Sequence, residues 1–354
     1  MTDFEQTWAE QIREAAASKT PLRIRGGGSK DFYGQQLAGT VLDAKAHRGV
    51  ISHEPTELVV KVRAGTPLAE LEAALLAEGQ MLGFEPPHFG PDATVGGCVA
   101  AGLSGPRRAT AGAVRDFMLG VTLLDGRGNR LHFGGEVMKN VAGYDVARLM
   151  TGSLGTLGVL LDVSIKVLPL PVAEATLRFE MDALEAVAQM NRWGGQPLPV
   201  SATSWMAGVL TVRLSGAEAA VTAACARLGG ERLSEQAARA HWQGLREQSQ
   251  GFFGGEAPLW RLSVPSVAEA TGLAGSQLIE WGGAQRWVRT EQDAASVRAR
   301  ATALGGHATL FRGADKSVGA FHPLPPALRS IHQRLKHSFD PDGILNPGRL
   351  YDGL

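Results

Sequence analysis

The sequence contains very little cysteine. Cys98 and Cys225 are the two cysteines among 354 residues, and small apolar residues flank each of them. Two cysteines so far apart match no metal-binding spacing and make no disulfide framework. They also cannot hold an iron–sulfur cluster, which needs several cysteine thiolates. We therefore expect no metal site and no cluster in this chain.

Net charge and long hydrophobic runs are missing as well. Lys and Arg number 35, and Asp and Glu also number 35, so the charge does not favour nucleic acid or an anionic membrane as a partner. No run of about 18 apolar residues occurs, which excludes a predicted membrane-spanning helix. Residues 1–19 lack the basic and apolar regions of a signal peptide and predict an amphipathic helix. A cytoplasmic location is the default expectation.

Glycine, in contrast, is abundant. The chain has 45 glycines, well above the ~7% that is usual, and the excess lies between residues 26 and 158. The stretch RGGGSK places three glycines directly after a predicted strand, which indicates a nest of backbone N–H groups for a phosphate. Further glycine-bearing segments are PDATVGGCVAAGLSG, AGAVRDFMLGV and TGSLGTLGV.

Neither standard nucleotide-binding motif fits these segments. Asp31 stands where a dinucleotide motif counted from Gly26 would need glycine, and no Gly-Lys-Ser/Thr triplet exists. Each segment alone is also typical of a turn or a helix cap. Together, several separate loops could instead surround one extended ligand.

The pattern along the chain predicts an α+β protein. Its first half contains predicted strands at 22–25 and near 39–45, and a helix from the Thr66–Pro67 pair to Gly79. Residues 83–116 are predicted as one long functional loop, and 117–135 as a hairpin. Pro169 and Pro171, in LPLP, mark the predicted end of the first domain.

Beyond this boundary, predicted strands and helices alternate. Strands are expected near 175–181, 209–214, 258–264, 277–282 and 285–289, and helices near 182–193, 217–228, 232–248, 266–273 and 291–304. This pattern indicates an α+β domain made of two ferredoxin-like half-units. The remaining residues predict a basic helix and a tail with fixed turns. We therefore predict domains at 1–171 and 172–320, followed by a C-terminal segment at 321–354.

The order of several motifs is similar to that of a known family. These motifs are RGGGSKDFYG, GPDATVGGCVAAGLSGPRR, GAVRDFMLGVTLLDGRG, KNVAGYDVARLMTGSLGTLGVL and FDPDGILNPGRL. From about residue 20 to the end, the sequence resembles the vanillyl-alcohol oxidase/PCMH flavoprotein superfamily, and within it the FAD-binding E subunits of bacterial glycolate oxidases. KNVAGYD and NPGR carry the most specific part of this resemblance. The family implies a two-lobed PCMH-type FAD-binding domain, a cap domain and a tail that returns to the FAD domain.

The resemblance also implies where FAD would bind. Gly26–Ser29 would fold over the pyrophosphate, 92–104 would follow the pyrophosphate and the flavin ring, and 155–159 would contact the adenosine part. The implied FAD-binding residues are Arg25, Gly26, Gly27, Gly28, Ser29, Pro91, Asp92, Thr94, Val95, Gly96, Gly97, Gly102, Ser104, Gly112, Asp116, Gly155, Gly158, Val159, Asn346 and Arg349. Glycine stands where many relatives carry the histidine that bonds to flavin, so we expect non-covalent FAD.

Candidate catalytic residues follow from the chemistry of 2-hydroxy acids. Oxidation needs a base for the hydroxyl proton, for which His88, His307 and His322 are candidates, and a cation for the carboxylate, for which Arg312 and Arg349 are candidates. His88 in its Pro-rich loop is also typical of a structural histidine that bonds a carbonyl, and His307 of an edge-strand position. The histidine-rich metal motif of catalytic relatives is missing.

The function implied by the resemblance is that of one subunit in a glycolate oxidase complex. Its expected partners are a homologous FAD-linked catalytic subunit and an iron–sulfur subunit, and the expected substrate is a small 2-hydroxy acid such as glycolate. Through these partners the chain would reach the inner membrane peripherally. Two alternatives stay open: a self-sufficient FAD-dependent 2-hydroxy-acid oxidoreductase, and an accessory scaffold subunit with a degenerate flavin site.

Overall fold

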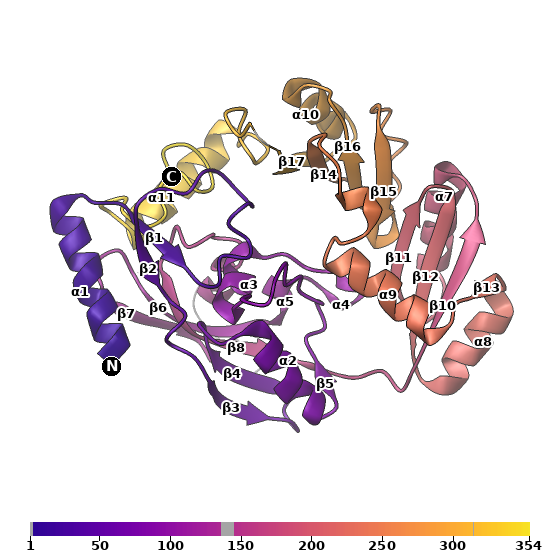
Figure 1. The fold of residues 1–354 in the computed structure, drawn as a ribbon, viewed down its shortest axis with the longest axis horizontal. Helices are drawn as coiled ribbons and strands as arrows, with labels where there is room; N and C mark the ends of the chain where they lie inside the picture. The colour runs from indigo at the N-terminus through magenta and orange to yellow at the C-terminus, as the bar shows by residue number, and fades with distance from the viewer. Residues whose placement is uncertain (1–2, 136–144, 314) are drawn as a thin grey trace. The chain divides into compact units, whose positions relative to one another are not determined.

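The computed structural model describes residues 3–135, 145–313 and 315–354. These residues group into two compact units (Figure 1). The first unit comprises Met1–Leu103, Ala113–Leu170 and Pro323–Leu354, and the second comprises Ser104–Gly112 and Pro171–His322. Both units combine helices with mainly antiparallel sheet, so the predicted α+β class is confirmed.

The first unit is built on a five-stranded antiparallel sheet in the order β3-β4-β8-β6-β7. The middle strand, β8, has the sequence VLLDVSIK and is buried at every position except the last, so both faces of the sheet are covered along this strand. A parallel β1–β2 pair and an antiparallel β5–β9 pair complete the strands. The elements are α1 (Asp3–Ser18), β1 (Leu22–Arg25), β2 (Thr40–Asp43), β3 (Val50–Glu54), β4 (Val59–Arg63), α2 (Leu68–Ala77), β5 (Gln80–Met81), α3 (Val95–Ala101), α5 (Val114–Phe117), β6 (Met118–Leu124), β7 (Arg130–Gly134), α6 (Val146–Leu149), β8 (Val159–Lys166), β9 (Leu168–Pro169) and α11 (Pro326–Phe339).

The amphipathic first helix packs on this unit as the sequence pattern predicts. Trp8 and Ile12, one turn apart on α1, are buried in a core with Leu42, Leu161 and Leu345. Burying one such side chain contributes about 1.5 to 3 kcal/mol. The helix is thereby held against the β1–β2 pair and the C-terminal tail (Figure 1).

The C-terminal tail runs beside β1. The N–H of Leu22 donates to the carbonyl of Ile344 at 2.7 Å, and the N–H of Asn346 donates to the carbonyl of Leu22 at 2.9 Å. The predicted return of the tail to the first domain is therefore confirmed. This pairing also leaves the tail at the end of β1 where the triple-glycine turn begins.

A buried ion pair holds α11 and the tail together. The Lys336 ammonium donates to Asp340 Oδ2 at 2.7 Å and to the carbonyls of Thr156 and Leu345 at 2.9 and 2.6 Å. Asp340 in turn accepts the N–H of Leu345 at 2.7 Å. Burial lowers the pKa of the Lys336 ammonium, and the Asp340 carboxylate opposes this shift. All three donated bonds end on acceptors inside the unit, so this lysine is structural.

The second unit is one eight-stranded antiparallel sheet in the order β13-β10-β12-β11-β15-β16-β14-β17. Along the chain, the first half has the order β-α-β-β-α-β. Across the sheet, its strands have the order β13-β10-β12-β11, and the strands of the second half follow in the reverse order, β15-β16-β14-β17, with β11 paired to β15. The first half is therefore ferredoxin-like as predicted, and the second half shares its strand order but has no helix between β14 and β15. The elements are α4 (Arg108–Ala111), β10 (Ala173–Glu180), α7 (Ala183–Gly194), β11 (Val200–Met206), β12 (Val209–Gly216), α8 (Glu218–Leu228), β13 (Glu231–Arg232), α9 (Glu235–Arg246), η1 (Gly251–Phe253), β14 (Leu259–Ser263), β15 (Ser276–Glu280), η2 (Trp281–Gly283), β16 (Gln285–Arg289), α10 (Ala294–Ala303) and β17 (His307–Arg312).

The helix predicted near 266–273 is wrong. Arginine side chains occupy carbonyl oxygens that a helix would use: Arg286 donates to Ala268 at 3.0 Å, and Arg300 donates to Ala270 and Thr271 at 2.6 Å each. The segment is therefore irregular, although its alanines suit a helix.

The first half of the sheet also contains a strand, β11, that the sequence pattern does not predict. β11 carries buried serines, and Ser201 and Ser204 pair with Ser215 at 2.6 Å and with the His241 ring at 2.9 Å. Its polar composition conceals a strand that has partners on both sides, β12 and β15.

Two predictions for the first unit are also corrected. Residues 83–116 are not one loop, because they contain α3, α4 and α5. Thr66 does not cap α2, whose N-cap is Pro67; the Thr66 hydroxyl instead accepts the N–H of Gly49 at 2.8 Å. None of the described helices is both long enough and apolar enough to cross a membrane.

The Lys336–Asp340 pair gives a test of this packing. Lys336→Met is expected to lower the free energy of unfolding by about 3 to 5 kcal/mol, because it leaves the Asp340 carboxylate buried without its cation. Urea denaturation measures the loss. Arg334→Met, an exposed change on the same helix, is the matched control and should stay within about 0.5 kcal/mol of the parent. Equal stabilities of the two variants would contradict the structural role of Lys336.

Candidate functional site

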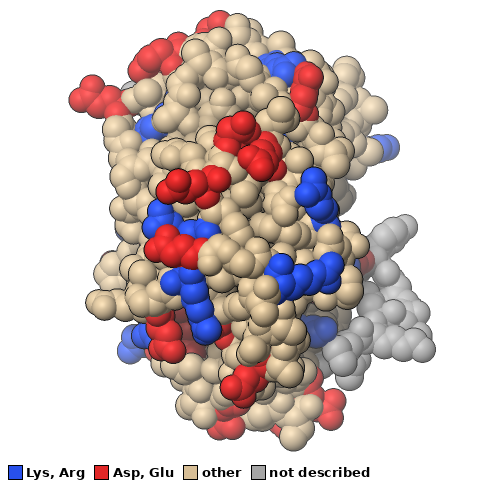
Figure 2. Space-filling model, turned by 90° about the vertical axis from the view of Figure 1, so that its right-hand side faces the viewer, with Lys and Arg blue, Asp and Glu red and all other residues tan. Residues whose placement is uncertain are grey.

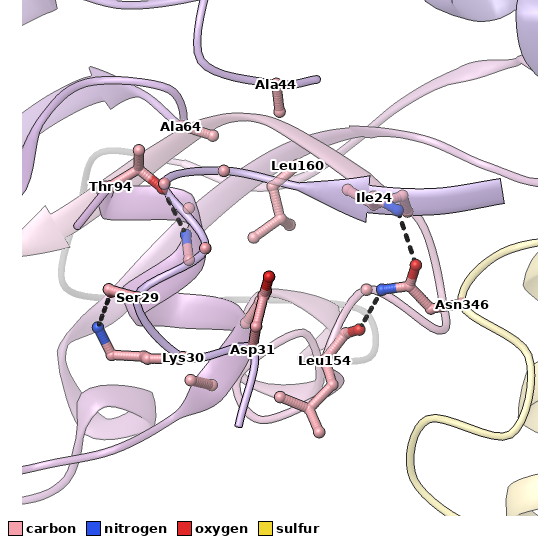
Figure 3. A pocket seen from close by; sticks show the side chains of 18 of the residues that line it. Ile24, Ser29, Lys30, Asp31, Ala44, Ala64, Thr94, Leu154, Leu160 and Asn346 are labelled. Atoms are coloured by element: carbon pink, nitrogen blue, oxygen red, sulfur yellow. Dashed lines mark hydrogen bonds between the residues drawn. The ribbon is translucent and has the colours of Figure 1, made fainter. Parts of the chain in front are cut away.

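A pocket in the first unit collects most of the glycine-bearing segments (Figure 3). It encloses about 800 Å³, including the part open to solvent, and lies within the range of about 300 to 1,000 Å³ for ligand pockets. Its walls come from β1 and the following turn, the start of α3, the turn before β8, and the tail. The lining residues are Ile24, Gly26, Gly27, Gly28, Ser29, Lys30, Asp31, Leu37, Ala44, Ala64, Thr94, Gly96, Gly97, Ala100, Ala101, Leu154, Gly155, Gly158, Leu160, Asn346 and Arg349.

The triple-glycine turn is packed directly against the segment 92–94. A Cβ at Gly27 would lie 1.4 Å from the carbonyl oxygen of Asp92, and one at Gly26 would lie 2.3 Å from the Thr94 hydroxyl. Gly28 has φ +75°, a conformation that L side chains rarely adopt. From the sequence, the glycines were expected to allow the close approach of a ligand. The structure shows that close packing against Asp92 and Thr94 already requires glycine at positions 26 and 27.

The turn that lines the pocket contains unpaired backbone donors. Within the described ranges, no acceptor pairs with the N–H groups of Gly26, Gly27, Gly28 and Ser29. The last edge donor of β1, the N–H of Ile24, is taken by Asn346 Oδ1 at 2.7 Å, so the unpaired donors begin immediately after it. Backbone N–H groups that the protein leaves unpaired need an acceptor from solvent or a ligand. A run of them in a turn is a binding site for an anion such as a phosphate.

The beginning of α3 behaves differently. The Thr94 hydroxyl caps the helix by accepting the N–H of Gly97 at 3.2 Å. The N–H groups of Val95 and Gly96 donate to the carbonyls of Thr66 and Ala64 at 2.9 and 2.7 Å. The N–H groups in the first turn of α3 therefore all have acceptors within the chain and none remains for an anion. This turn contributes to the wall of the pocket only through its packing.

The charge around the pocket is positive. Asp31 is neutralised by two arginines, since its Oδ2 lies 2.5 Å from a terminal nitrogen of Arg23 and 3.0 Å from Arg25 Nε. Lys30 and Arg349 add two further cations, and burial lowers the pKa of the Arg349 guanidinium to about 10, with Asp31 opposing the shift. The Arg349 guanidinium therefore remains charged at neutral pH, and basic side chains outnumber the one acidic side chain, so the surroundings favour an anionic ligand.

Asn346 and Arg349 are fixed by the chain itself. Asn346 Nδ2 donates to the carbonyl of Leu154 at 2.6 Å, so its amide joins the end of β1 to the turn before β8 (Figure 3). Arg349 donates to carbonyls that follow the glycine turn, at Asp31 (2.9 Å), Tyr33 and Gln35. Both side chains line the pocket, yet their polar atoms position the loops.

The pocket does not include every predicted FAD-binding residue. Gly26, Gly27, Gly28, Ser29, Thr94, Gly96, Gly97, Gly155, Gly158, Asn346 and Arg349 line it. Residues of the first unit that are outside this lining are Arg25, Pro91, Asp92, Val95, Gly102, Asp116 and Val159, and Ser104 and Gly112 belong to the second unit. Of the KNVAGYD motif, residues 139–144 lie outside the described residues. Roles for all these residues stay predictions.

Several lining residues were not anticipated from the sequence. Lys30 and Asp31 had a signal, because they directly follow the triple glycine. Ile24, Leu37, Ala44, Ala64, Ala100, Ala101, Leu154 and Leu160 had none, because apolar and small side chains carry no chemical signature of a pocket.

The catalytic candidates fall in both units. His88 belongs to the first unit, where its Nε2 pairs with Glu72 Oε2 at 2.9 Å and its carbonyl accepts from the Lys30 ammonium at 3.2 Å. His307 and His322 belong to the second unit, with ring centres 6.4 Å apart, and burial lowers the pKa of both imidazoles. His307 starts β17, the edge strand of its sheet, as predicted.

Arg312, the candidate cation, ends the same strand. Burial, with Arg289 adding to the effect, lowers the pKa of its guanidinium to about 10. The group is therefore still charged at neutral pH. Catalytic roles for the three histidines and this arginine remain predictions.

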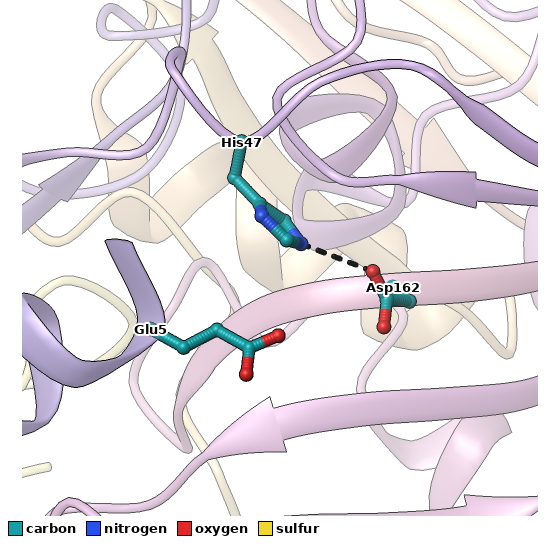
Figure 4. Close-up of side chains that lie close together, drawn as sticks. All are labelled: Glu5, His47 and Asp162. Atoms are coloured by element: carbon teal, nitrogen blue, oxygen red, sulfur yellow. Dashed lines mark hydrogen bonds and ion pairs between the residues drawn. The ribbon is translucent and has the colours of Figure 1, made fainter. Parts of the chain in front are cut away.

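Another group of side chains has the composition of a metal site. Ligand atoms of Glu5, His47 and Asp162 lie within 4.8 Å of one another, and all three residues are buried (Figure 4). His47 Nε2 pairs with Asp162 Oδ1 at 3.0 Å, and the Arg130 guanidinium lies 3.5 Å from Glu5 Oε2 and 3.8 Å from Asp162 Oδ2. The guanidinium supplies the positive charge that a metal would bring, so we interpret the group as a polar bridge from α1 to β8.

Comparison with known proteins agrees with these features. A family model described as an FAD binding domain matches residues 4–134. The glycolate oxidase subunit GlcE of Escherichia coli (strain K12) is 49% identical over 352 residues, which cover 99% of both chains. The chain belongs to the family of this subunit. Its cofactor is FAD, and the unpaired donors, positive charge and apolar walls of the pocket fit a ligand of that kind.

More distant relatives match part of the chain. The D-lactate dehydrogenase of Anaerostipes hadrus is 32% identical over 147 residues, which are 42% of this chain and 30% of that protein. The glycolate oxidase subunit GlcD of Bacillus subtilis (strain 168) is 28% identical over 173 residues, 48% of this chain and 37% of that protein. A solved alkyldihydroxyacetonephosphate synthase has a TM-score of 0.66 at 14% identity and covers 96% of this chain and 73% of its own, which shows a shared fold.

The contact between the two loops gives a direct test. Gly27→Ala is expected to lower the free energy of unfolding by about 3 kcal/mol and to weaken FAD binding, because its Cβ would overlap the backbone of Asp92. Urea denaturation and a fluorescence titration with FAD measure the two effects. Gly135→Ala is the control, since its Cβ would meet no atom within 4 Å. An unchanged FAD affinity in Gly27→Ala would contradict the proposed loop contact.

The cysteine on α3 gives a second test. Burial raises the pKa of the Cys98 thiol to about 12, so the reactive thiolate is essentially absent at pH 8. Native protein treated with iodoacetamide should therefore be modified at Cys225 and not at Cys98, whereas protein in urea should be modified at both. Mass spectrometry of the peptides measures this. Rapid modification of Cys98 in the folded chain would show that α3 is not packed as described.

Proposed function

We propose that this chain is the FAD-binding subunit of a glycolate oxidase complex, which contributes to the oxidation of glycolate to glyoxylate and passes electrons through its flavin to a partner subunit or acceptor. The observation that carries the proposal is the run of unpaired N–H groups at Gly26–Ser29 inside a positively charged pocket. It supports a working flavin site, because a degenerate site would have no reason to leave these donors unpaired. Full-length similarity to GlcE supports the choice of complex.

The residues of the chain would bind and orient the cofactor. The N–H groups of Gly26–Ser29 would hold its pyrophosphate, and Lys30 and Arg349 would supply compensating charge. FAD, when bound, would supply the acceptor for the hydride from the α-carbon of glycolate, so the protein would need a base only for the hydroxyl proton. We propose non-covalent binding, because no histidine or cysteine is among the described residues of the pocket lining.

The proton acceptor is proposed to be one of the candidate histidines. His88 has the arrangement of an oriented base, since the Glu72 carboxylate fixes its ring. His307 and His322 have lowered pKa values and are therefore neutral at pH 7, as a base must be before it accepts a proton. Arg312 would pair with the carboxylate of a 2-hydroxy acid.

The proposed partners are a homologous FAD-linked subunit and an iron–sulfur subunit. GlcD shares sequence similarity with part of this chain, which supports a homologous partner. An iron–sulfur partner is proposed because the two cysteines of this chain cannot hold a cluster. On the face drawn in Figure 2, basic and acidic side chains are interspersed, without a basic patch of the kind nucleic acid needs. We propose a cytoplasmic subunit that reaches the inner membrane only through its partners.

The first experiment is an absorbance spectrum of the chain purified alone and in its co-expressed complex, before and after anaerobic glycolate. We expect flavin bands in both samples, with bleaching in the complex and none in the chain alone, because substrate oxidation is assigned to the assembled complex. Bleaching in the chain alone would favour a self-sufficient 2-hydroxy-acid oxidoreductase. A colourless chain that takes up no FAD would contradict the proposal and favour a scaffold role.

A further inference from the structure

The C-terminal helix exposes apolar side chains that the fold of its own unit does not cover. Leu328 and Ile331 on α11 are 47% and 42% exposed. They lie at helical spacing with Leu335, which is half-buried, so the three form one stripe along the helix. We call Leu328, Ile331 and Leu335 the α11 stripe. α11 is drawn in yellow in Figure 1.

The stripe leads into a hollow of the first unit. Leu335 and His332 form one wall of a hollow of about 660 Å³, including the part open to solvent, and Leu149, Leu157 and Leu350 form apolar parts of the other walls. The hydroxyl of Thr151, which also lines the hollow, is closed to solvent and has no hydrogen-bond partner among the described residues. A buried hydroxyl without a partner costs free energy. Because this hydroxyl is closed to solvent, a partner could not reach it, and the hollow offers an incoming chain apolar contact with Leu149, Leu157 and Leu350.

The charged side chains of α11 itself are basic, and the Arg329 guanidinium donates to the carbonyl of Asp352 in the tail at 2.9 Å. The sequence of α11, PALRSIHQRLKHSF, contains no acidic residue. Arg329 and Arg334 are exposed, and the helical period places them on opposite sides of the stripe. A binding segment therefore meets apolar contact along the centre and positive charge at both edges, which suits an apolar segment that carries carboxylates.

We propose that the α11 stripe and its hollow are the docking surface for another subunit of the oxidase, and that the docking segment is amphipathic, with leucine-type side chains toward the stripe and carboxylates opposite Arg329 and Arg334. This proposal rests on the proposed function, because it assumes that the chain works in a complex. The surface explains how a subunit with an ordinary soluble composition could be held in an assembly.

Other occupants fit this surface less well. A second copy of the chain would bring the same basic helix, so a symmetric contact would place Arg329 and Arg334 near their own copies. A membrane surface suits basic helices, but it would gain little from two exposed apolar side chains and would leave the hollow unfilled. A protein segment satisfies the stripe, the hollow and the charge together.

The test uses a tagged full-length chain co-expressed with the other subunits of its oxidase. Ile331→Glu is expected to reduce the partner subunits recovered on affinity resin at least tenfold, because it places a carboxylate in the apolar stripe. The double variant Arg329→Glu/Arg334→Glu should reduce recovery as well, most strongly at low salt. Leu184→Glu on α7 is the matched control, because Leu184 is 71% exposed and lies on the second unit, and it should leave recovery unchanged.

Measurements on each purified variant without its partners distinguish failure of the docking proposal from failure of the proposed FAD-binding function. FAD content and unfolding of each variant should equal those of the parent, so a loss of partners with flavin retained supports the docking surface. Partner recovery unchanged in both α11 variants would overturn it. Two other results would also overturn the docking proposal, provided that the other subunits stay bound to the variants. One is loss of flotation with anionic phosphatidylglycerol vesicles, and the other is loss of a dimer detected by sedimentation.

Discussion

The pocket of the first unit depends on one backbone contact, between the triple-glycine turn and the segment 92–94. The Gly27 backbone lies so close to the Asp92 carbonyl that a methyl group could not be placed between them. The contact fixes the turn, whose residues line the pocket, against the segment that leads into α3. The donors proposed for the cofactor are main-chain groups, whose direction is set by packing and does not depend on the rotamer of any side chain.

The polar groups around the pocket are of two kinds: backbone donors without a partner, and groups that are hydrogen-bonded within the chain. Donors at Gly26–Ser29 are left unpaired for a ligand, whereas nearly every neighbouring polar atom is used by the chain. Asn346 and Arg349 bond to backbone groups of β1 and of the loop that follows the turn, and Thr94 caps α3. Arg23 and Arg25 neutralise Asp31, so the cations that remain give the site its sign. Hydrogen-bonded polar groups thus surround the four backbone N–H groups of Gly26–Ser29, which have no partner among the described residues.

The sequence predicts the parts of this arrangement that are local. The strand at 22–25, the hairpin after residue 117 and the first helix follow from hydrophobic period and turn residues, and the structure confirms each. The glycines could be found as a ligand loop, but not their contact with Asp92, because nothing in the order of residues shows which two loops meet. Arg349 could be placed near the cofactor by resemblance, while its role as an anchor for carbonyls requires coordinates.

The wrong helix prediction near 266–273 and the unpredicted strand β11 have one cause, which is a side chain from a distant part of the sequence. The segment near 266–273 has helical composition, and the arginines that claim its carbonyls are Arg286 and Arg300, which come later in the chain. β11 looks too polar for an inner strand until Ser204 is seen to pair with His241 from α9. Burial lowers the pKa of that imidazole to about 4, with Arg178 and Arg213 adding to the effect, so it is a neutral partner for the serine. In each case a long-range side chain overrides the local preference.

The segment Ser104–Gly112 shows what this implies for the two units. It follows α3, a wall of the pocket, by only two residues, yet its contacts belong to the second unit. Arg107 pairs with Glu174 at 2.7 Å, the Thr110 hydroxyl donates to Ser201 at 3.0 Å, and the Trp281 indole donates to the carbonyl of Gly105 at 3.1 Å. A stretch so short between α3 and these anchors allows little slack. The part of the pocket wall that Ala100 and Ala101 form is therefore joined to the second unit by a very short stretch of chain.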